Sequence, residues 1–261
     1  MNRQDFSDAF TTLLNSYAYA AQQGEQSSKL DIVLDEYEKS VFLTKAQEEL
    51  VLSLYNGKNN YGESFEQTEE LRRYLSNLVV DIELEADTGS NNKPLSTDNQ
   101  HKFYTLPDGS GDAPAVWFIT YEGAEVSAGY CRGTEGNAES TSTGVTLDVY
   151  PVRQDEYHKI RKNPFRGANN RRVLRADLAD GVVELISKYD IQKYYVRYLR
   201  KPKPILLDTF EGLSIDGEYK ASDPACELHE ALHQKILELA VQMALQSRGI
   251  NSRGNSDKKD N

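Results

Sequence analysis

The stretch VVELISKYDIQKYYVRYLRKPKP, residues 182–204, decides the fold of this chain. Val182–Ser187 and Tyr194–Arg200 are rich in β-branched, aromatic and aliphatic residues, which is typical of strands. An irregular link follows at Pro202 and Pro204, because proline has no amide hydrogen to donate to a sheet. The stretch therefore predicts that the second half of the chain is built on a β-sheet.

Segments of the same character precede this stretch, at Phe103–Leu106, Ala115–Val126, Val145–Val152 and Val173–Asp177. A loop rich in Gly, Ser and Thr, residues 129–144, separates two of them and is expected to be mobile in the free chain. One short helix is predicted at Asp155–Lys162, where Asn163-Pro164 ends it, because the residue before proline avoids the helical conformation. We expect residues 86–207 to form one β-domain with this loop and helix inserted.

Residues 1–85 are predicted to form a helical bundle. In the first helix, before Gly24, apolar side chains recur at helical spacing, at Phe6, Phe10, Leu13, Leu14, Tyr17 and Ala21. A second, short helix is predicted at residues 30–37. Two more helices are predicted to open at capping boxes, formed by Thr44 with Gln47 and by Ser64 with Gln67.

Residues 208–261 are predicted to hold a link, an amphipathic helix and a polar tail. The helix covers about Glu227–Gln246 and is expected to pack back on the helical bundle. The tail from Ser247 has Ile250 as its one large apolar residue, so it cannot bury enough area to offset its ordering entropy. The predicted fold class is α+β, with an N-terminal helical bundle, a mainly antiparallel β-domain and a returning C-terminal helix.

Composition excludes several classes of protein. Of the 261 residues 38% are hydrophobic and 27% are charged, as in folded soluble chains. Residues 1–10 lack the apolar run of a secretory signal, and no stretch reaches the roughly 18 apolar residues of a membrane span. Cys131 and Cys226 give neither a disulfide framework nor a zinc-finger spacing. We expect no membrane partner.

Residues 229–233, HEALH, match the zinc-hydrolase motif H-E-x-x-H. On a helix His229 and His233 would share a face and could hold zinc, while Glu230 would activate a water molecule. A catalytic zinc needs a third protein ligand, and Glu238 on the same helix is poorly placed to supply one. We therefore expect no functional metal, and a zinc-dependent hydrolase remains the alternative.

Other catalytic motifs are missing from the sequence. It contains no G-x-x-x-x-G-K-[ST], no G-x-G-x-x-G and no G-x-S-x-G. Cys131 lies beside Arg132 without an evident partner histidine, and His101 and His158 are isolated. We expect a non-enzymatic protein that uses no cofactor.

The net charge of −11 hides one basic segment. Residues 151–203 carry 14 basic and 6 acidic side chains, whereas residues 1–90 carry 7 and 17. The densest part of the segment contains Lys159, Arg161, Lys162, Arg166, Arg171, Arg172 and Arg175. A patch of one sign mainly steers association, so we expect these residues to contact an acidic neighbour, including another copy of the chain. A nucleic-acid-binding module that uses the basic block at 159–203 is the alternative, although the acidic remainder would repel phosphate.

Three segments resemble a structural protein of the crAss-like tailed bacteriophages. Residues 150–207, which begin YPVRQDEYHKIRKNPFRG, carry the resemblance in the β-domain. CELHEALHQKILELAVQMAL at 226–245 resembles the C-terminal helix of that family, and LDEYEKSVFLTKAQEELVLSLYNG at 34–57 its N-terminal part. The likeness is weakest over residues 86–145. It implies a ring or adaptor subunit of the head–tail connector.

The same resemblance implies the partners and the location. Copies would form a cyclic oligomer, a dodecamer, which bridges the capsid's portal and the other tail or ring proteins. Genomic DNA would pass through the lumen without sequence-specific binding. The protein would reside in the connector or tail of the virion after synthesis in the cytoplasm of the bacterial host. The HEALH stretch would then lie in a helix with a packing role.

Overall fold

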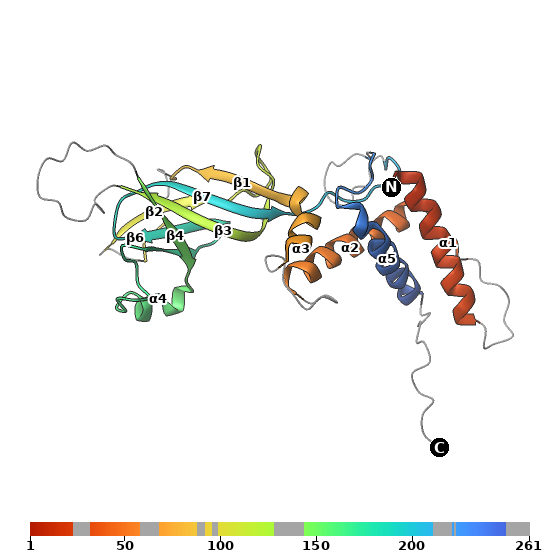
Figure 1. Ribbon diagram of the computed structural model, residues 1–261, viewed down its shortest axis with the longest axis horizontal. Helices are drawn as coiled ribbons and strands as arrows, with labels where there is room; N and C mark the ends of the chain where they lie inside the picture. The colour runs from red at the N-terminus through yellow and green to blue at the C-terminus, as the bar shows by residue number, and fades with distance from the viewer. Residues whose placement is uncertain are drawn as a thin grey trace, which may run out of the picture. The chain divides into compact units, whose positions relative to one another are not determined.

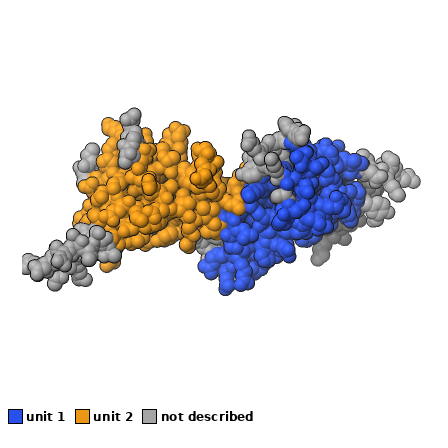
Figure 2. Space-filling model, turned by 90° about the horizontal axis from the view of Figure 1, so that it is seen from above, with its two compact units in different colours: residues 1–78, 202–261 blue, residues 79–201 orange. Residues whose placement is uncertain are grey.

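A computed structural model of the chain describes residues 1–22, 32–57, 68–87, 92–95, 99–127, 144–210, 221 and 223–248. The chain forms two compact units, which Figure 2 colours separately. Residues 1–78 with 202–261 are called the helical unit below, and residues 79–201 the sheet unit. Residues 129–143 of the predicted loop at 129–144, and residues 249–261 of the predicted tail from Ser247, lie outside the described residues.

The helical unit contains α1 (Arg3–Gln22), α2 (Glu36–Tyr55), α3 (Glu69–Tyr74) and α5 (His233–Ser247), with the 3₁₀-helices η1 (Ser76–Leu78) and η3 (Glu230–Leu232). α5 lies against α1 and α2, which confirms the predicted return of the C-terminal helix (Figure 1). Burial of apolar side chains from all three helices holds them together. The core includes Phe6, Phe10, Leu14, Leu43, Leu54, Ile236 and Leu237.

The start of α2 differs from the prediction. Asp35 is its N-cap, because the Asp35 side chain accepts the Glu38 amide and the Glu38 side chain accepts the Asp35 amide. The predicted caps Thr44 and Gln47 lie inside α2, where Thr44 Oγ1 accepts the backbone N–H of Ile205 at 3.1 Å. The two predicted helices are therefore one. Thr68 caps α3, and the predicted cap at residues 64–67 lies outside the described residues.

The sheet unit is one seven-stranded sheet in the order β1-β7-β3-β4-β5-β6-β2. The strands are β1 (Val79–Leu84), β2 (Gln100–Thr105), β3 (Val116–Val126), β4 (Val145–Pro151), β5 (Arg172–Asp177), β6 (Val182–Ser187) and β7 (Ile191–Arg200). Every neighbouring pair is antiparallel except β4 with β5. The predicted α+β class with a mainly antiparallel sheet is confirmed.

The parallel pair follows from the connection between its strands. β4 and β5 are joined by a crossover that contains α4 (Gln154–Ile160), and parallel neighbours need such a long connection. Tyr157 of α4 is 1% exposed, packed against Leu174 and Ile186 on one face of the sheet. The opposite face holds the main core of the unit. α4 therefore packs on the face of the sheet that lies opposite the main core.

Candidate assembly surface

The basic segment lies on α4 and on the turn and loop that lead to β5. Five of its side chains are exposed, and they are Lys159, Arg161, Lys162, Arg166 and Arg171. Arg172, at the start of β5, is half-buried, and Arg175 is buried. Tyr157 anchors α4, which carries Lys159, to the sheet. In the loop that follows, Asn169 Oδ1 accepts the Arg171 amide at 2.8 Å.

The turn at residues 163–167, NPFRG, displays an aromatic side chain. Phe165 is 84% exposed. Asn163 Oδ1 accepts the Phe165 amide at 2.9 Å, and the Asn163 carbonyl accepts the Gly167 amide at 2.7 Å. A Cβ at position 167 would lie 3.0 Å from the Asn163 carbonyl oxygen, so the turn favours glycine there. The turn holds Phe165 in solvent, where it adds little to the core.

A hollow of about 610 Å³ lies beside this turn. Its lining residues are Asp148, Tyr150, Pro164, Phe165, Asn169, Asn170, Arg171 and Arg172. The Arg172 guanidinium lies 4.0 Å from the centre of the Tyr150 ring, a cation–π contact. Arg172 Nη1 also donates to the Phe165 carbonyl at 3.3 Å. We call the five exposed cations, Phe165 and this hollow the basic face.

Arg175 has a different environment from the other predicted interface residues. Its Nη1 lies 2.6 Å from Glu122 Oε2, and its Nε lies 2.9 Å from Asp177 Oδ1. Burial lowers the pKa of Arg175, but its hydrogen bond to Glu122 and the charges of both carboxylates outweigh burial and raise the pKa above its ordinary value. The Tyr194 phenol also donates to Glu122. Arg175 is thus bound inside the sheet, and the basic face consists of its neighbours.

The HEALH segment does not form the regular helix start that the sequence predicts. Glu230–Leu232 form the 3₁₀-helix η3, and α5 begins only at His233. His229 has extended backbone angles, and its Nδ1 accepts the Ala231 amide at 3.3 Å. His233 is 4% exposed and donates from Nε2 to the Leu228 carbonyl at 3.1 Å. Each imidazole supports local structure, and the two do not share a helical face.

The side chains of His233 and Cys226 are both buried. Burial lowers the pKa of His233, opposed by its bond to Leu228 and aided by the charge of the N-terminal amine. Burial raises the pKa of Cys226 to about 11, so its thiol stays protonated near neutral pH. In the described ranges no three His, Cys, Asp or Glu side chains are placed to hold a metal ion. No described helix is long and apolar enough to cross a membrane.

The basic face combines exposed arginine side chains with an exposed aromatic side chain. Both residue types are enriched in protein–protein interfaces. The family model described as "Phage tail ring protein 3/4" matches residues 1–256, and the chain belongs to this family. It is therefore a structural ring protein of a phage tail, located in the virion, and not an enzyme. The resemblance found in the sequence is confirmed.

Two relatives come from Bacteroides phage crAss001. "Ring protein 3" is 42% identical over 251 residues, which cover 95% of this chain and 96% of that protein. "Ring protein 4/5" is 28% identical over 254 residues, with coverage of 94% and 92%. Both matches span the helical unit and the sheet unit together.

Proposed function

We propose that copies of this chain close into a twelve-membered ring in the head–tail connector, where the ring bridges the portal and the tail. The observation that carries this proposal is the match of the ring-protein family model to residues 1–256, which include both units of the chain. Both crAss001 relatives are named as ring proteins and cover the chain to the same extent.

The charge of the chain suits a ring that conducts DNA. Twelve copies at −11 each would carry a formal charge of −132. An acidic lumen repels phosphate, so double-stranded DNA slides through it without sequence-specific binding. The cations of the basic face then serve protein contacts between subunits or between rings.

The basic face is the proposed contact for an acidic neighbour. Lys159, Arg161, Lys162, Arg166, Arg171 and Arg172 are the residues of the segment that remain after Arg175 is assigned to the interior. Complementary charge speeds and orients association, and it disfavours wrong partners. These side chains are not part of the sheet core, so their replacement should impair assembly and spare folding.

Labelling of intact particles tests the location. A chain carrying a C-terminal epitope tag is supplied to infecting phage, and gold-labelled antibody is imaged on portal-containing particles and on isolated tails. Label at the junction of head and tail supports the proposal. Label confined to the distal end of the tail would contradict the bridging role.

A further inference from the structure

We propose that the Phe165 turn of one copy docks into a second hollow, in the helical unit of the neighbouring copy. This inference rests on the proposed ring. It specifies the two surfaces through which neighbouring copies would meet. The donor surface lies on the sheet unit and the acceptor on the helical unit. Each subunit thus presents two different faces, as a ring of more than two copies requires, because only head-to-tail contacts generate such a cycle.

The donor is preorganised. The bonds from Asn163 fix the turn in the free chain, so docking orders few additional groups. Phe165 is 84% exposed, and the exposed cations Arg166 and Arg171 lie close to it in the chain. An aromatic side chain with arginine beside it is the composition that interface hot spots favour.

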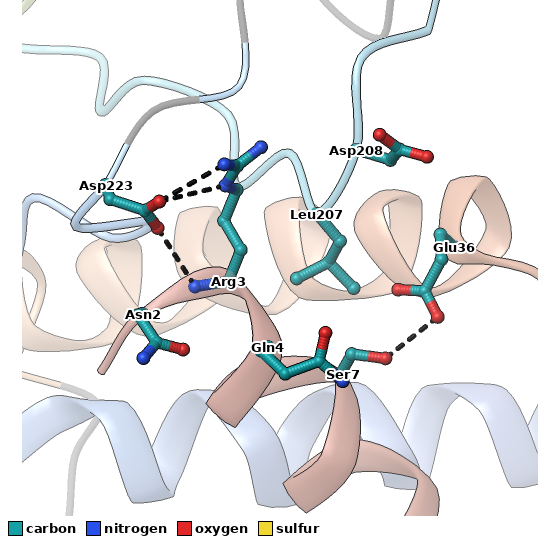
Figure 3. A pocket seen from close by; sticks show the side chains of 8 residues that line it. All are labelled: Asn2, Arg3, Gln4, Ser7, Glu36, Leu207, Asp208 and Asp223. Carbon is teal, nitrogen blue, oxygen red and sulfur yellow. Dashed lines mark hydrogen bonds and ion pairs between the residues drawn. The ribbon is translucent and has the colours of Figure 1, made fainter.

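The acceptor hollow measures about 590 Å³ and lies where the starts of α1 and α2 meet the chain near residue 208. Its lining residues are Asn2, Arg3, Gln4, Ser7, Glu36, Leu207, Asp208 and Asp223. Figure 3 shows Leu207 between the Arg3–Asp223 ion pair and Glu36. Leu207 is the one apolar residue among these lining residues and is 7% exposed. The hollow has room for one aromatic ring, which would contact Leu207 and the aliphatic parts of the polar side chains.

The charges on the acceptor leave one carboxylate for an incoming cation. Arg3 binds Asp223 at 3.2 Å, and Lys39 binds Glu36 at 2.7 Å. Asp208 is exposed, and its carboxylate holds the adjacent Thr209 amide. We therefore pair Asp208 of the acceptor with Arg171 of the donor.

Charge complementarity points to a second copy as the occupant. The helical unit carries 14 basic and 23 acidic side chains, a net charge of −9, while the sheet unit carries 16 and 18. Every subunit in a ring has a neighbouring copy, so an acidic helical unit is available to each donor turn. Double-stranded DNA would satisfy the cations but gives Phe165 no cavity to fill.

A photoreactive analogue of phenylalanine at position 165 identifies what the turn touches. The variant chain is supplied to infecting phage, assembled particles are irradiated, and the cross-linked peptides are identified by mass spectrometry. We expect a cross-link to the peptide around Leu207 and Asp208 of another copy, and none from a matched analogue at Tyr17, which is 40% exposed on α1. A cross-link to a different tail protein or to DNA would overturn the inference.

Charge reversal tests the pairing independently. Arg171→Glu and Asp208→Arg should each lower incorporation into particles about tenfold or more, as for an interface hot spot. The double variant should return to within about threefold of the wild type, because each copy then carries both halves of the reversed contact. Arg153→Glu, at the start of α4, is the matched control and should incorporate normally. Equal defects in the single and double variants would refute the pairing.

These outcomes separate the inference from the proposed function. Thermal unfolding of each purified variant first excludes misfolding, since surface reversals should shift stability little. Particles that contain a closed ring at the connector but cross-link position 165 to the portal would refute only the copy-to-copy contact. Copies that cross-link as expected in a structure away from the connector would refute only the bridging role.

Discussion

Glu122 of β3 and Arg175 of β5 form an ion pair of 2.6 Å inside the sheet unit, with side chains 6% and 10% exposed. β4 lies between these two strands in the sheet. β4 pairs with each neighbour over only four residue pairs. The ion pair therefore joins β3 to β5 across a strand that has only a short ladder with either neighbour.

Glu122→Leu should destabilise the protein strongly, because it leaves Arg175 charged, buried and without its nearest carboxylate. Loss of one partner of a buried pair costs about 3–5 kcal/mol. Chemical denaturation measures the change in the free energy of unfolding. The matched control is Asp155→Leu, which breaks an exposed pair with Arg153 and should cost less than about 1 kcal/mol. Similar small losses in both variants would contradict the role of the pair.

His233 should make the protein less stable in mild acid. Its pKa is lowered in the fold by burial, so the unfolded chain binds the proton more readily. The free energy of unfolding should therefore fall as the pH drops below the unfolded value of about 6.5 towards the lowered pKa. Denaturation at several pH values between neutral and mild acid measures this slope.

His233→Gln keeps a donor for the Leu228 carbonyl and removes the titration, so it should flatten the pH dependence. His158→Gln, at an exposed position of α4, is the control and should retain the wild-type slope. The N-terminal amine, His229 and Glu230 also act on His233, and they remain unchanged in both variants. Equal slopes in the wild type and His233→Gln would show that His233 is not the titrating group.

Asp35→Ala should cost about 1 kcal/mol, because Asp35 supplies the capping side chain at the start of α2. Asp8→Ala, on the exposed side of α1, should change the free energy of unfolding by less than about 0.5 kcal/mol. Thermal or chemical unfolding distinguishes the two. If Asp8→Ala lowered the free energy of unfolding more than Asp35→Ala, Asp35 would not be the N-cap of α2.

The HEALH segment should bind no stoichiometric zinc. His229 binds the Ala231 amide and His233 binds the Leu228 carbonyl. His229 lies in extended backbone before η3, whereas His233 is the first residue of α5. Elemental analysis after purification without chelator should find well under one zinc per chain, both in the wild type and in His229→Ala. One zinc per chain, lost in the variant, would revive the hydrolase alternative.

Strands with a clear local pattern of apolar and β-branched residues were predicted correctly from the sequence. Val182–Ser187 forms β6 as expected, and residues 116–126 form β3 within the predicted strand. The strand at Val79–Leu84 was missed, because its identity depends on pairing with β7 more than a hundred residues later. The helix start predicted at Thr44 and Gln47 was wrong for a related reason. Both side chains bind the distant chain segment at Lys203 and Ile205 and do not cap a helix.

The sequence predicted which residues make up the basic segment, but not how their side chains are arranged. Charge density located the basic segment, but it did not reveal that strand alternation turns Arg175 inward beside Val173. A charged Glu122 within an apolar strand was the available signal for a buried partner. For Phe165, Asn163-Pro164 indicated a turn, and only the folded structure shows that its aromatic side chain faces solvent.

Cryo-electron microscopy of intact virions would locate the chain and count its copies. We expect density at the head–tail connector to fit twelve copies of this chain as a closed ring around the DNA channel, with the portal on one side and the tail on the other. A chain found only as open or non-cyclic copies, or in a ring away from the connector, would contradict this expectation.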